Sequence, residues 1–163
     1  MRVTVVVRTA DLGNPADGAG IVTVLDSYAS DLVGGGEPLS DAVRATLIDK
    51  LAEQPTALVL VAVDDARCVG IAICFFGFST FAAQPLLNIH DLAVLPAYRG
   101  QGIGRALLAA AERHAREHGC CKLTLEVLET NERARGLYRS VGFDDLTFGN
   151  SGPARFLTKP LNA

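Results

Sequence analysis

The chain has 163 residues, 49% of them hydrophobic, and a formal net charge of −3. This length allows one domain with a substantial core, over residues 1–163, and the hydrophobic content excludes a disordered chain. The acidic balance and the absence of a basic run argue against nucleic acid as a ligand, whereas they suit a cationic amine. No apolar run approaches the roughly 20 residues of a membrane span, so we expect no membrane partner.

The apolar run at residues 3–7 is too short for the core of a signal peptide, so we expect a cytoplasmic protein. The four cysteines, Cys68, Cys74, Cys120 and Cys121, show neither CxxC nor Cys/His metal spacing. We therefore expect buried, reduced thiols and no metal site.

The first part of the chain predicts a strand followed by two helices. The run VTVVV predicts a strand over residues 2–8, and a helix is predicted over residues 17–32. Three glycines at 34–36 place a loop after this helix. Ser40 can cap a second helix, whose apolar positions recur at helical spacing as far as Leu51.

Three apolar strands are predicted next, over residues 57–63, 68–78 and 86–95. Asp64 and Asp65 supply the turn between the first two strands, and the third also runs antiparallel. Strands that are buried on both faces have unbroken apolar runs of this kind, so we expect helices on both faces of this sheet.

The C-terminal part of the chain predicts two helices, each followed by strand. These elements are a helix over residues 102–118 that stops at Gly119, a strand over 122–128, a helix that Asn131 caps and Gly142 ends, and two closing strands over 143–148 and 155–159.

The stretch LAVLPAYRGQGIGR, residues 92–105, predicts an apolar strand, a glycine-rich bend and the start of a helix. Its three glycines omit side chains where the backbone must bend or lie against a ligand. The first N–H groups of a helix lack internal partners, and the positive end of the helix dipole lies there, which favours phosphate. Arg99 and Arg105 flank the bend with guanidinium groups suited to bidentate phosphate contacts. The stretch therefore predicts a site for a diphosphate.

Spacing distinguishes the known kinds of diphosphate loop. A P-loop needs a lysine after its glycines, and none follows here. The dinucleotide pattern GxGxxG lacks its third glycine whether it starts at Gly100 or at Gly102, which weakens the dinucleotide-binding alternative. Glu126, however, follows the glycines at the sequence spacing of the acidic residue that binds a ribose in such proteins. The pattern that fits fully is Arg-x-x-Gly-x-Gly at residues 99–104.

This pattern resembles the pyrophosphate loop of the GNAT family of N-acetyltransferases, which binds acetyl-CoA. A second match is LYRSVGF at residues 137–143, which is similar to the family's LYxxxGF helix. The order of the predicted elements is also similar to the GNAT fold over the full length, and the Ile-His-Asp-Leu strand resembles the polyamine/diamine acetyltransferase branch. The resemblance implies an α+β, three-layer acyl-CoA N-acyltransferase fold, with a mixed, mostly antiparallel sheet flanked by helices.

The resemblance further implies an enzyme that moves an acetyl group from acetyl-CoA to a primary amine of a small molecule or peptide, by direct attack in a ternary complex. The amides of Leu92 and Val94 would bind the thioester carbonyl and the pantetheine arm. Strand amides are available only where the ladder is interrupted, so we expect a bulge or splay between His90 and Leu92. The residues implied to bind acetyl-CoA are Leu92, Ala93, Val94, Arg99, Gly100, Gln101, Gly102, Ile103, Gly104, Arg105, Asn131 and Ala134.

Tyr138 occupies the family's position for the general acid that protonates the leaving thiolate. A phenol with a pKa of about 10 can protonate a thiolate whose thiol has a pKa of about 8.5. His90 is the candidate general base because imidazole titrates near neutrality. Asp91, Glu126 and water are alternatives to His90.

An alternative function is a non-catalytic sensor or scaffold that binds CoA, which would need no acid, and Tyr138 favours the enzyme instead. Many relatives pair through their C-terminal strands, and the two late strands predicted here have edges that need covering, so we expect a homodimer. The acceptor stays open among polyamines, amino acids, peptide N-termini, protein lysines and aminoglycosides.

Overall fold

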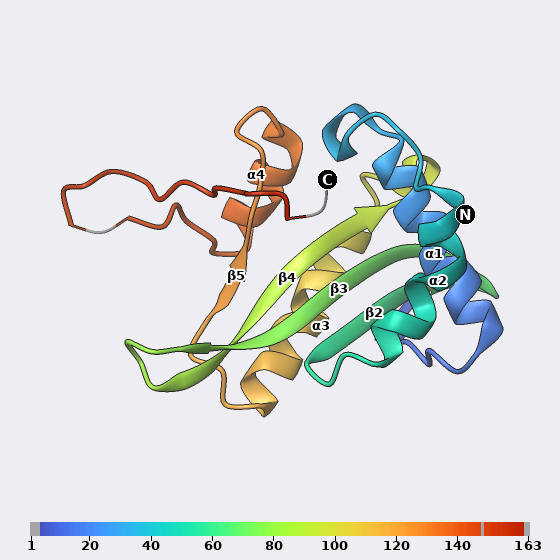
Figure 1. The fold of residues 1–163 in the computed structure, drawn as a ribbon, viewed down its shortest axis with the longest axis horizontal. Helices are drawn as coiled ribbons and strands as arrows, with labels where there is room; N and C mark the ends of the chain where they lie inside the picture. The colour runs from blue at the N-terminus through green and yellow to red at the C-terminus, as the bar shows by residue number, and fades with distance from the viewer. Residues whose placement is uncertain (1–3, 148, 162–163) are drawn as a thin grey trace. The chain divides into compact units, whose positions relative to one another are not determined.

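The computed structural model describes residues 4–147 and 149–161. Figure 1 follows the chain through its helices and strands, which are β1 (Val5–Thr9), α1 (Pro15–Ala29), the short 3-10 helix η1 (Leu32–Gly34), α2 (Asp41–Ala52), β2 (Ala57–Asp64), β3 (Arg67–Ser79), β4 (Gln84–Val94), the 3-10 helix η2 (Pro96–Tyr98), α3 (Ile103–Glu117), β5 (Leu123–Leu125) and α4 (Glu132–Ser140). These elements fall into two compact units, divided between Leu125 and Glu126.

The first unit holds one sheet of five strands in the order β1-β2-β3-β4-β5 (Figure 1). The strands β1 to β4 pair antiparallel with their neighbours, and β4 pairs parallel with β5. The predicted turn between β2 and β3 is present, with Asp65 in left-handed backbone at a φ of 53°. The mixed, mostly antiparallel sheet that the sequence predicts is therefore confirmed.

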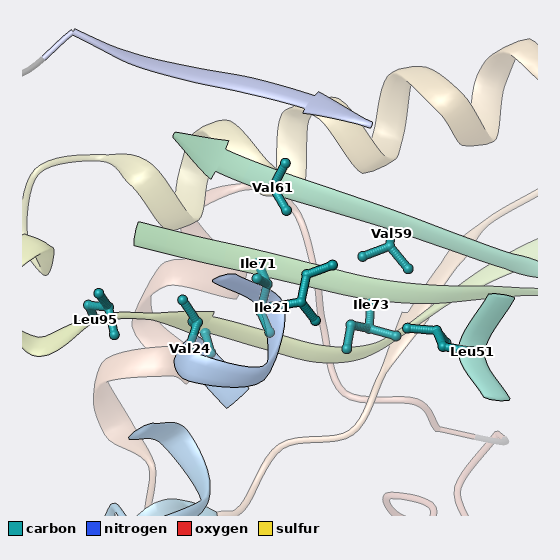
Figure 2. Packing of buried hydrophobic residues seen from close by; sticks show 9 residues of the cluster. Ile21, Val24, Leu51, Val59, Val61, Ile71, Ile73 and Leu95 are labelled. Carbon is teal, nitrogen blue, oxygen red and sulfur yellow. The ribbon is translucent and has the colours of Figure 1, made fainter. Parts of the chain in front are cut away.

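Helices cover both faces of the central strands, as the unbroken apolar runs predict. Figure 2 shows the face on which α1 and α2 pack, with the buried side chains Ile21, Val24, Leu51, Val59, Val61, Ile71, Ile73 and Leu95. Side chains alternate along a strand, so Gly70 belongs to the opposite face. A Cβ added there would lie 3.1 Å from the Ile103 side chain and 3.3 Å from that of Leu107. Gly70 therefore lets α3 lie close against β3.

Side-chain caps begin three of the helices. Asn14 accepts a hydrogen bond from the amide of Ala16, Ser40 from that of Val43, and Asn131 from that of Ala134, at 2.9, 3.3 and 3.2 Å. Each oxygen satisfies one of the N–H groups that a first helical turn leaves unpaired. The predicted caps at Ser40 and Asn131 are confirmed.

The predicted helix over residues 17–32 ends early, at Ala29, and its last predicted residue lies in η1. The hydrogen-bond pattern changes there: the Ser30 amide still donates to the Asp26 carbonyl four residues back, at 3.1 Å, whereas the Asp31 amide donates to the Tyr28 carbonyl three residues back, at 3.0 Å. From Asp31 onward the chain forms a tighter turn, which leads to the left-handed Gly35 and Gly36.

Near the C-terminus one predicted strand is shorter than expected and two predicted strands are wrong. The strand predicted over residues 122–128 is confined to Leu123–Leu125, because its ladder with β4 ends at Ile89. The closing strands predicted over 143–148 and 155–159 do not form within 143–147 and 149–161, where the chain makes an isolated bridge between Thr147 and Pro153. Phe148 lies outside the described residues. An alternating pattern forms a strand only where a neighbouring edge accepts its backbone groups.

Among the described residues no helix is both long and apolar enough to cross a membrane. The cysteines are unpaired, with Cys74 buried and Cys121 exposed, so the expectation of buried thiols is wrong for Cys121. Burial raises the pKa of the Cys74 thiol to about 12, which keeps it protonated at neutral pH.

Candidate active site

The strand β4 carries an irregularity at the position where the sequence predicts one. In the β3–β4 ladder Ile73 lies opposite Asp91 while the next residue, Cys74, lies opposite Ile89. His90 is therefore an extra residue on β4, and the predicted bulge is confirmed.

The bulge changes which amides of β4 face the β5 side. Before it, the Leu87 amide donates to the Lys122 carbonyl, towards β5, at 3.1 Å. After it, the Leu95 amide donates to the Val69 carbonyl, towards β3, at 2.9 Å. Backbone groups alternate along a strand, so the amides of Leu92 and Val94 point away from β3.

These amides have no strand partner on that side within the described residues. The parallel ladder between β4 and β5 pairs three residues and ends at Ile89 and Leu125. The edge of β4 beyond the bulge, at Leu92 and Val94, therefore has amides that no strand of the described residues pairs with.

A glycine bend joins this edge to α3. Gly100 and Gly102 have φ angles of 77° and 83°, in the left-handed region that favours glycine. A Cβ added at either would meet no atom within 4 Å apart from its chain neighbours, so the outer side of the bend is open. Gly102 is the N-cap, and the first helical hydrogen bond runs from the Ala106 amide to its carbonyl, at 3.0 Å. The amides of Ile103 and Gly104 precede this bond and point out of the helix end.

The two arginines beside the bend differ in their surroundings. Arg99 is half-buried and donates to the Val94 carbonyl through Nε, at 3.0 Å, and to the Asp31 carboxylate through Nη2, at 2.9 Å. Arg105 is exposed on the first turn of α3. The neighbouring Gln101 donates to the Ala97 carbonyl at 3.2 Å.

The turn η2 is fixed against the β2–β3 hairpin. The Tyr98 hydroxyl donates to the Asp64 carboxylate at 3.2 Å, and the Arg67 guanidinium lies 5.9 Å from the centre of the Tyr98 ring. Sequence reasoning missed the parts that Tyr98, Asp64 and Asp31 play in supporting the bend. Only the position of Tyr98, directly before Arg99, could have drawn attention to it.

Titratable groups gather beside the bulge. Burial raises the pKa of Asp91, and the charge of His90 partly opposes this shift. Burial also raises the pKa of Tyr28, with the negative charges of Asp91 and Asp31 adding to the effect. His90 itself is exposed, and its ring meets that of Phe75 edge-on at 5.7 Å.

The second unit holds the other candidate residues. Asn131 caps α4 through the Ala134 amide, and Tyr138 lies in the last turns of that helix. The Tyr138 carbonyl accepts the Phe143 amide at 3.0 Å, and the two rings lie 5.9 Å apart, because Gly142 turns the chain back at a φ of 98°. Glu126 is exposed. The role of Tyr138 as the acid stays a prediction.

Comparison with known proteins identifies the family of this chain. Residues 22–143 match the model of the acetyltransferase (GNAT) family. The chain therefore belongs to the GNAT family of acetyltransferases, as residues 99–104 and 137–143 predict.

Two relatives carry the comparison further. The thialysine N-epsilon-acetyltransferase of Bos taurus is 36% identical over 123 residues, which is 68% of this chain and 72% of that protein. An uncharacterized N-acetyltransferase of Bacillus subtilis, YhfO, is 30% identical over 138 residues, 81% of this chain and 87% of the relative. These relatives indicate that the chain is an N-acetyltransferase.

Solved structures share the fold at low sequence identity. A transcriptional regulator from Bacillus halodurans superposes with a TM-score of 0.77 at 21% identity, over 95% of this chain and 99% of that one. A ribosomal-protein-alanine N-acetyltransferase from Brucella melitensis gives 0.71 at 23% identity, over 94% and 100%. These likenesses confirm the predicted α+β GNAT fold.

Proposed function

We propose that this protein transfers an acetyl group from acetyl-CoA to a primary amine of a small molecule or peptide, by direct attack in a ternary complex. The observation that carries the proposal is the bulge at His90, which turns the amides of Leu92 and Val94 to an open edge beside the uncapped start of α3. Strand amides at such an edge can donate to a thioester carbonyl and to the oxyanion that forms when an amine attacks it.

The glycine bend would hold the diphosphate of acetyl-CoA. The backbone from Gly100 to Gly104, with Gln101 and Ile103 between the glycines, presents N–H groups at the positive end of α3. The exposed Arg105 adds a positive charge there. The left-handed glycines leave the outer side of the bend free of side chains, as a bound diphosphate requires.

The remaining cofactor contacts belong to the neighbouring backbone and to the second unit. Ala93 lies between the two amide donors on β4, where its backbone would form the wall of the pantetheine site. Asn131 and Ala134 would contact the cofactor arm from the start of α4. Both contacts extend the family resemblance to residues at matching positions.

Proton transfer needs a base for the amine and an acid for the thiolate. We propose Tyr138 as the acid and His90, at the bulge, as the base. Asp91 remains an alternative, because burial raises its pKa and makes its carboxylate a stronger base than an exposed one. Water and Glu126 are further alternatives.

The decisive experiment combines a binding measurement with a product screen. Calorimetry should detect acetyl-CoA binding to the wild-type protein, and mass spectrometry should then detect an acetylated product from a library of primary amines. Diamines and lysine analogues belong in this library because one relative is a thialysine N-epsilon-acetyltransferase. Tight CoA binding without any acetylated product would favour the non-catalytic sensor, and absent CoA binding would exclude both functions.

We also propose that residues 1–163 form one domain in a cytoplasmic homodimer. The support is the family match, which runs across both units, and the exposed apolar side chains Phe156 and Leu157 near the C-terminus. Such side chains are suited to a protein interface. Light scattering at micromolar concentration should give the mass of a dimer, and a monomer mass would contradict the proposal.

A further inference from the structure

One guanidinium joins the end of β4 to the connector between α1 and α2, residues 30–40. Arg99 donates to the Val94 carbonyl and to the Asp31 carboxylate, with distances of 3.0 and 2.9 Å. The side chains of Arg99 and Asp31 are 27% and 31% exposed, so both charges are partly removed from water. A charge-assisted hydrogen bond in such a place is stronger than one at an open surface.

The backbone of the connector is organised around Asp31. Its carbonyl accepts hydrogen bonds from the amides of Gly34 and Gly36, at 2.9 and 3.0 Å, and its own amide donates to the Tyr28 carbonyl at 3.0 Å. Arg99 therefore holds the residue on which the bend of the connector depends.

The connector also lies beside the part of β4 that carries the open amides. Helix α1 contacts β4, and Tyr28 near its end packs against the same buried cluster as Tyr98. The charges of Asp91 and Asp31 both reach the Tyr28 phenol. Asp91 directly precedes Leu92, so the connector and the residue before the Leu92 edge both lie within electrostatic reach of the same phenol.

We propose that Arg99 is a positioning residue, whose guanidinium holds the connector against the end of β4 and thereby shapes the acceptor side of the site, and that this side chain does not bind phosphate. This inference rests on the proposed function. It assigns the diphosphate to the backbone of the glycine bend. The Nε and Nη2 atoms of Arg99 already donate to a carbonyl and a carboxylate, so the edge of the guanidinium that these two atoms form is committed to them.

The test uses Arg99→Gln, Asp31→Asn and the double variant, with Arg116→Gln as the matched control. Arg116 pairs with Glu112 on the exposed side of α3, so its variant removes an arginine ion pair away from the site. Three quantities are measured: the Kd for CoA by calorimetry, hydrogen exchange of residues 32–37, and the kinetic constants for an amine substrate.

The CoA Kd is expected to stay within about twofold of the wild-type value in every variant, because the backbone holds the diphosphate. Exchange of residues 32–37 should rise about fivefold in both single variants, and the double variant should add nothing further. The KM for the amine should rise by the same order while kcat stays nearly constant. The control variant should change none of these quantities.

Arg99→Lys gives a second, milder test. It keeps the positive charge that a phosphate would need, but it lacks the fork that reaches both Val94 and Asp31. It should therefore reproduce the faster exchange with an unchanged CoA Kd.

Two results would overturn the proposal. One is a CoA Kd that rises about tenfold or more in Arg99→Gln while Asp31→Asn binds as the wild type does, since this marks a phosphate ligand. The other is unchanged exchange in both single variants. A different result would contradict the proposed function, namely that the wild type neither binds acetyl-CoA nor acetylates an amine. The hydrogen-exchange measurement depends on neither activity, so the two failures can be distinguished.

Discussion

The two ends of α3 both carry a left-handed glycine, but they differ in whether the terminal backbone groups of the helix are hydrogen-bonded within the protein. At the C-terminal end, Gly119 donates to the Arg116 carbonyl and Cys120 to the Ala115 carbonyl, at 3.0 and 2.9 Å. This is the Schellman arrangement, which satisfies the last carbonyls of a helix. At the N-terminal end, Gly102 offers no capping side chain to the amides of Ile103 and Gly104.

The comparison separates a glycine that closes a helix from one that leaves it available to a ligand. Both glycines have positive φ angles, 68° at Gly119 and 83° at Gly102, and neither has a side-chain neighbour in the way of a Cβ. Backbone conformation and the space around the Cβ position therefore do not separate the two glycines. Changes at the open end should alter binding and turnover, whereas changes in satisfied parts of the fold should alter stability.

The largest expected effect compares Gly102→Glu with Gly119→Glu. Both variants place the same charge on left-handed backbone, but at Gly102 the carboxylate would occupy the proposed diphosphate position. Calorimetry should show loss of acetyl-CoA binding in Gly102→Glu and nearly wild-type binding in Gly119→Glu. If a folded Gly102→Glu protein binds with wild-type affinity, the diphosphate site has been misplaced.

The open end supplies donors from the backbone, so the proton for the thiolate must come from a side chain or from solvent. Tyr138→Phe keeps the ring but removes that proton, and kcat should fall about 10²–10⁴-fold. Affinity for acetyl-CoA should barely change, because the phenyl ring keeps its contact with Phe143. Steady-state kinetics on the amine from the screen measures this, and full turnover would remove Tyr138 from the role of acid.

A third prediction addresses the backbone donors themselves. Leu92→Pro removes an amide that points away from β3, so the antiparallel ladder should survive. The loss of an oxyanion donor should lower kcat about 10²–10³-fold. Leu92→Ala is the control, because it shortens the side chain and keeps the amide. Equal kcat values in the two variants, with thermal melts confirming that both are folded, would contradict the role of this amide.

The smallest effect on activity is expected at Asp17, whose carboxylate already has its hydrogen-bond partners within the fold. The Asp17 carboxylate is buried, accepts two hydrogen bonds from Arg8 at 2.7 Å each, and accepts a third from the Asp11 amide at 2.8 Å. Asp17→Asn should lower the free energy of unfolding at pH 7 by about 1–2 kcal/mol, with acetyl-CoA affinity unchanged. Urea unfolding measures the loss, with the exposed Asp49→Asn as a control that should have little effect.

The ion pair between Asp17 and Arg8 also predicts how the free energy of unfolding depends on pH. Hydrogen bonding to Arg8 lowers the pKa of Asp17 in the folded state. A lowered folded pKa adds stability at pH values above the unfolded pKa of about 3.9, and this contribution is lost as the pH falls through the folded value. The stability difference between the wild type and Asp17→Asn should therefore shrink below pH 4. A difference that stays constant to pH 2 would contradict this assignment.

The sequence by itself determined the features that depend on near neighbours. The caps at Ser40 and Asn131, the apolar stripe of α3 and the turn at Asp65 each arise within a few residues, so local chemistry predicts them. The apolar runs of β2 and β3 predicted helices on both faces, because an unbroken run can be buried only between two layers. The pattern at residues 99–104 indicated the family for the same reason, since its spacing is local.

Tertiary structure decided what depends on distant partners. The Arg99 guanidinium meets Asp31, 68 residues earlier, and no local pattern names that partner. The length of β5 was set by the ladder with β4, which ends at Ile89 one residue before the bulge. The prediction of two closing strands was wrong because an alternating pattern indicates only which face each residue prefers. It does not indicate whether another strand edge lies within hydrogen-bonding distance.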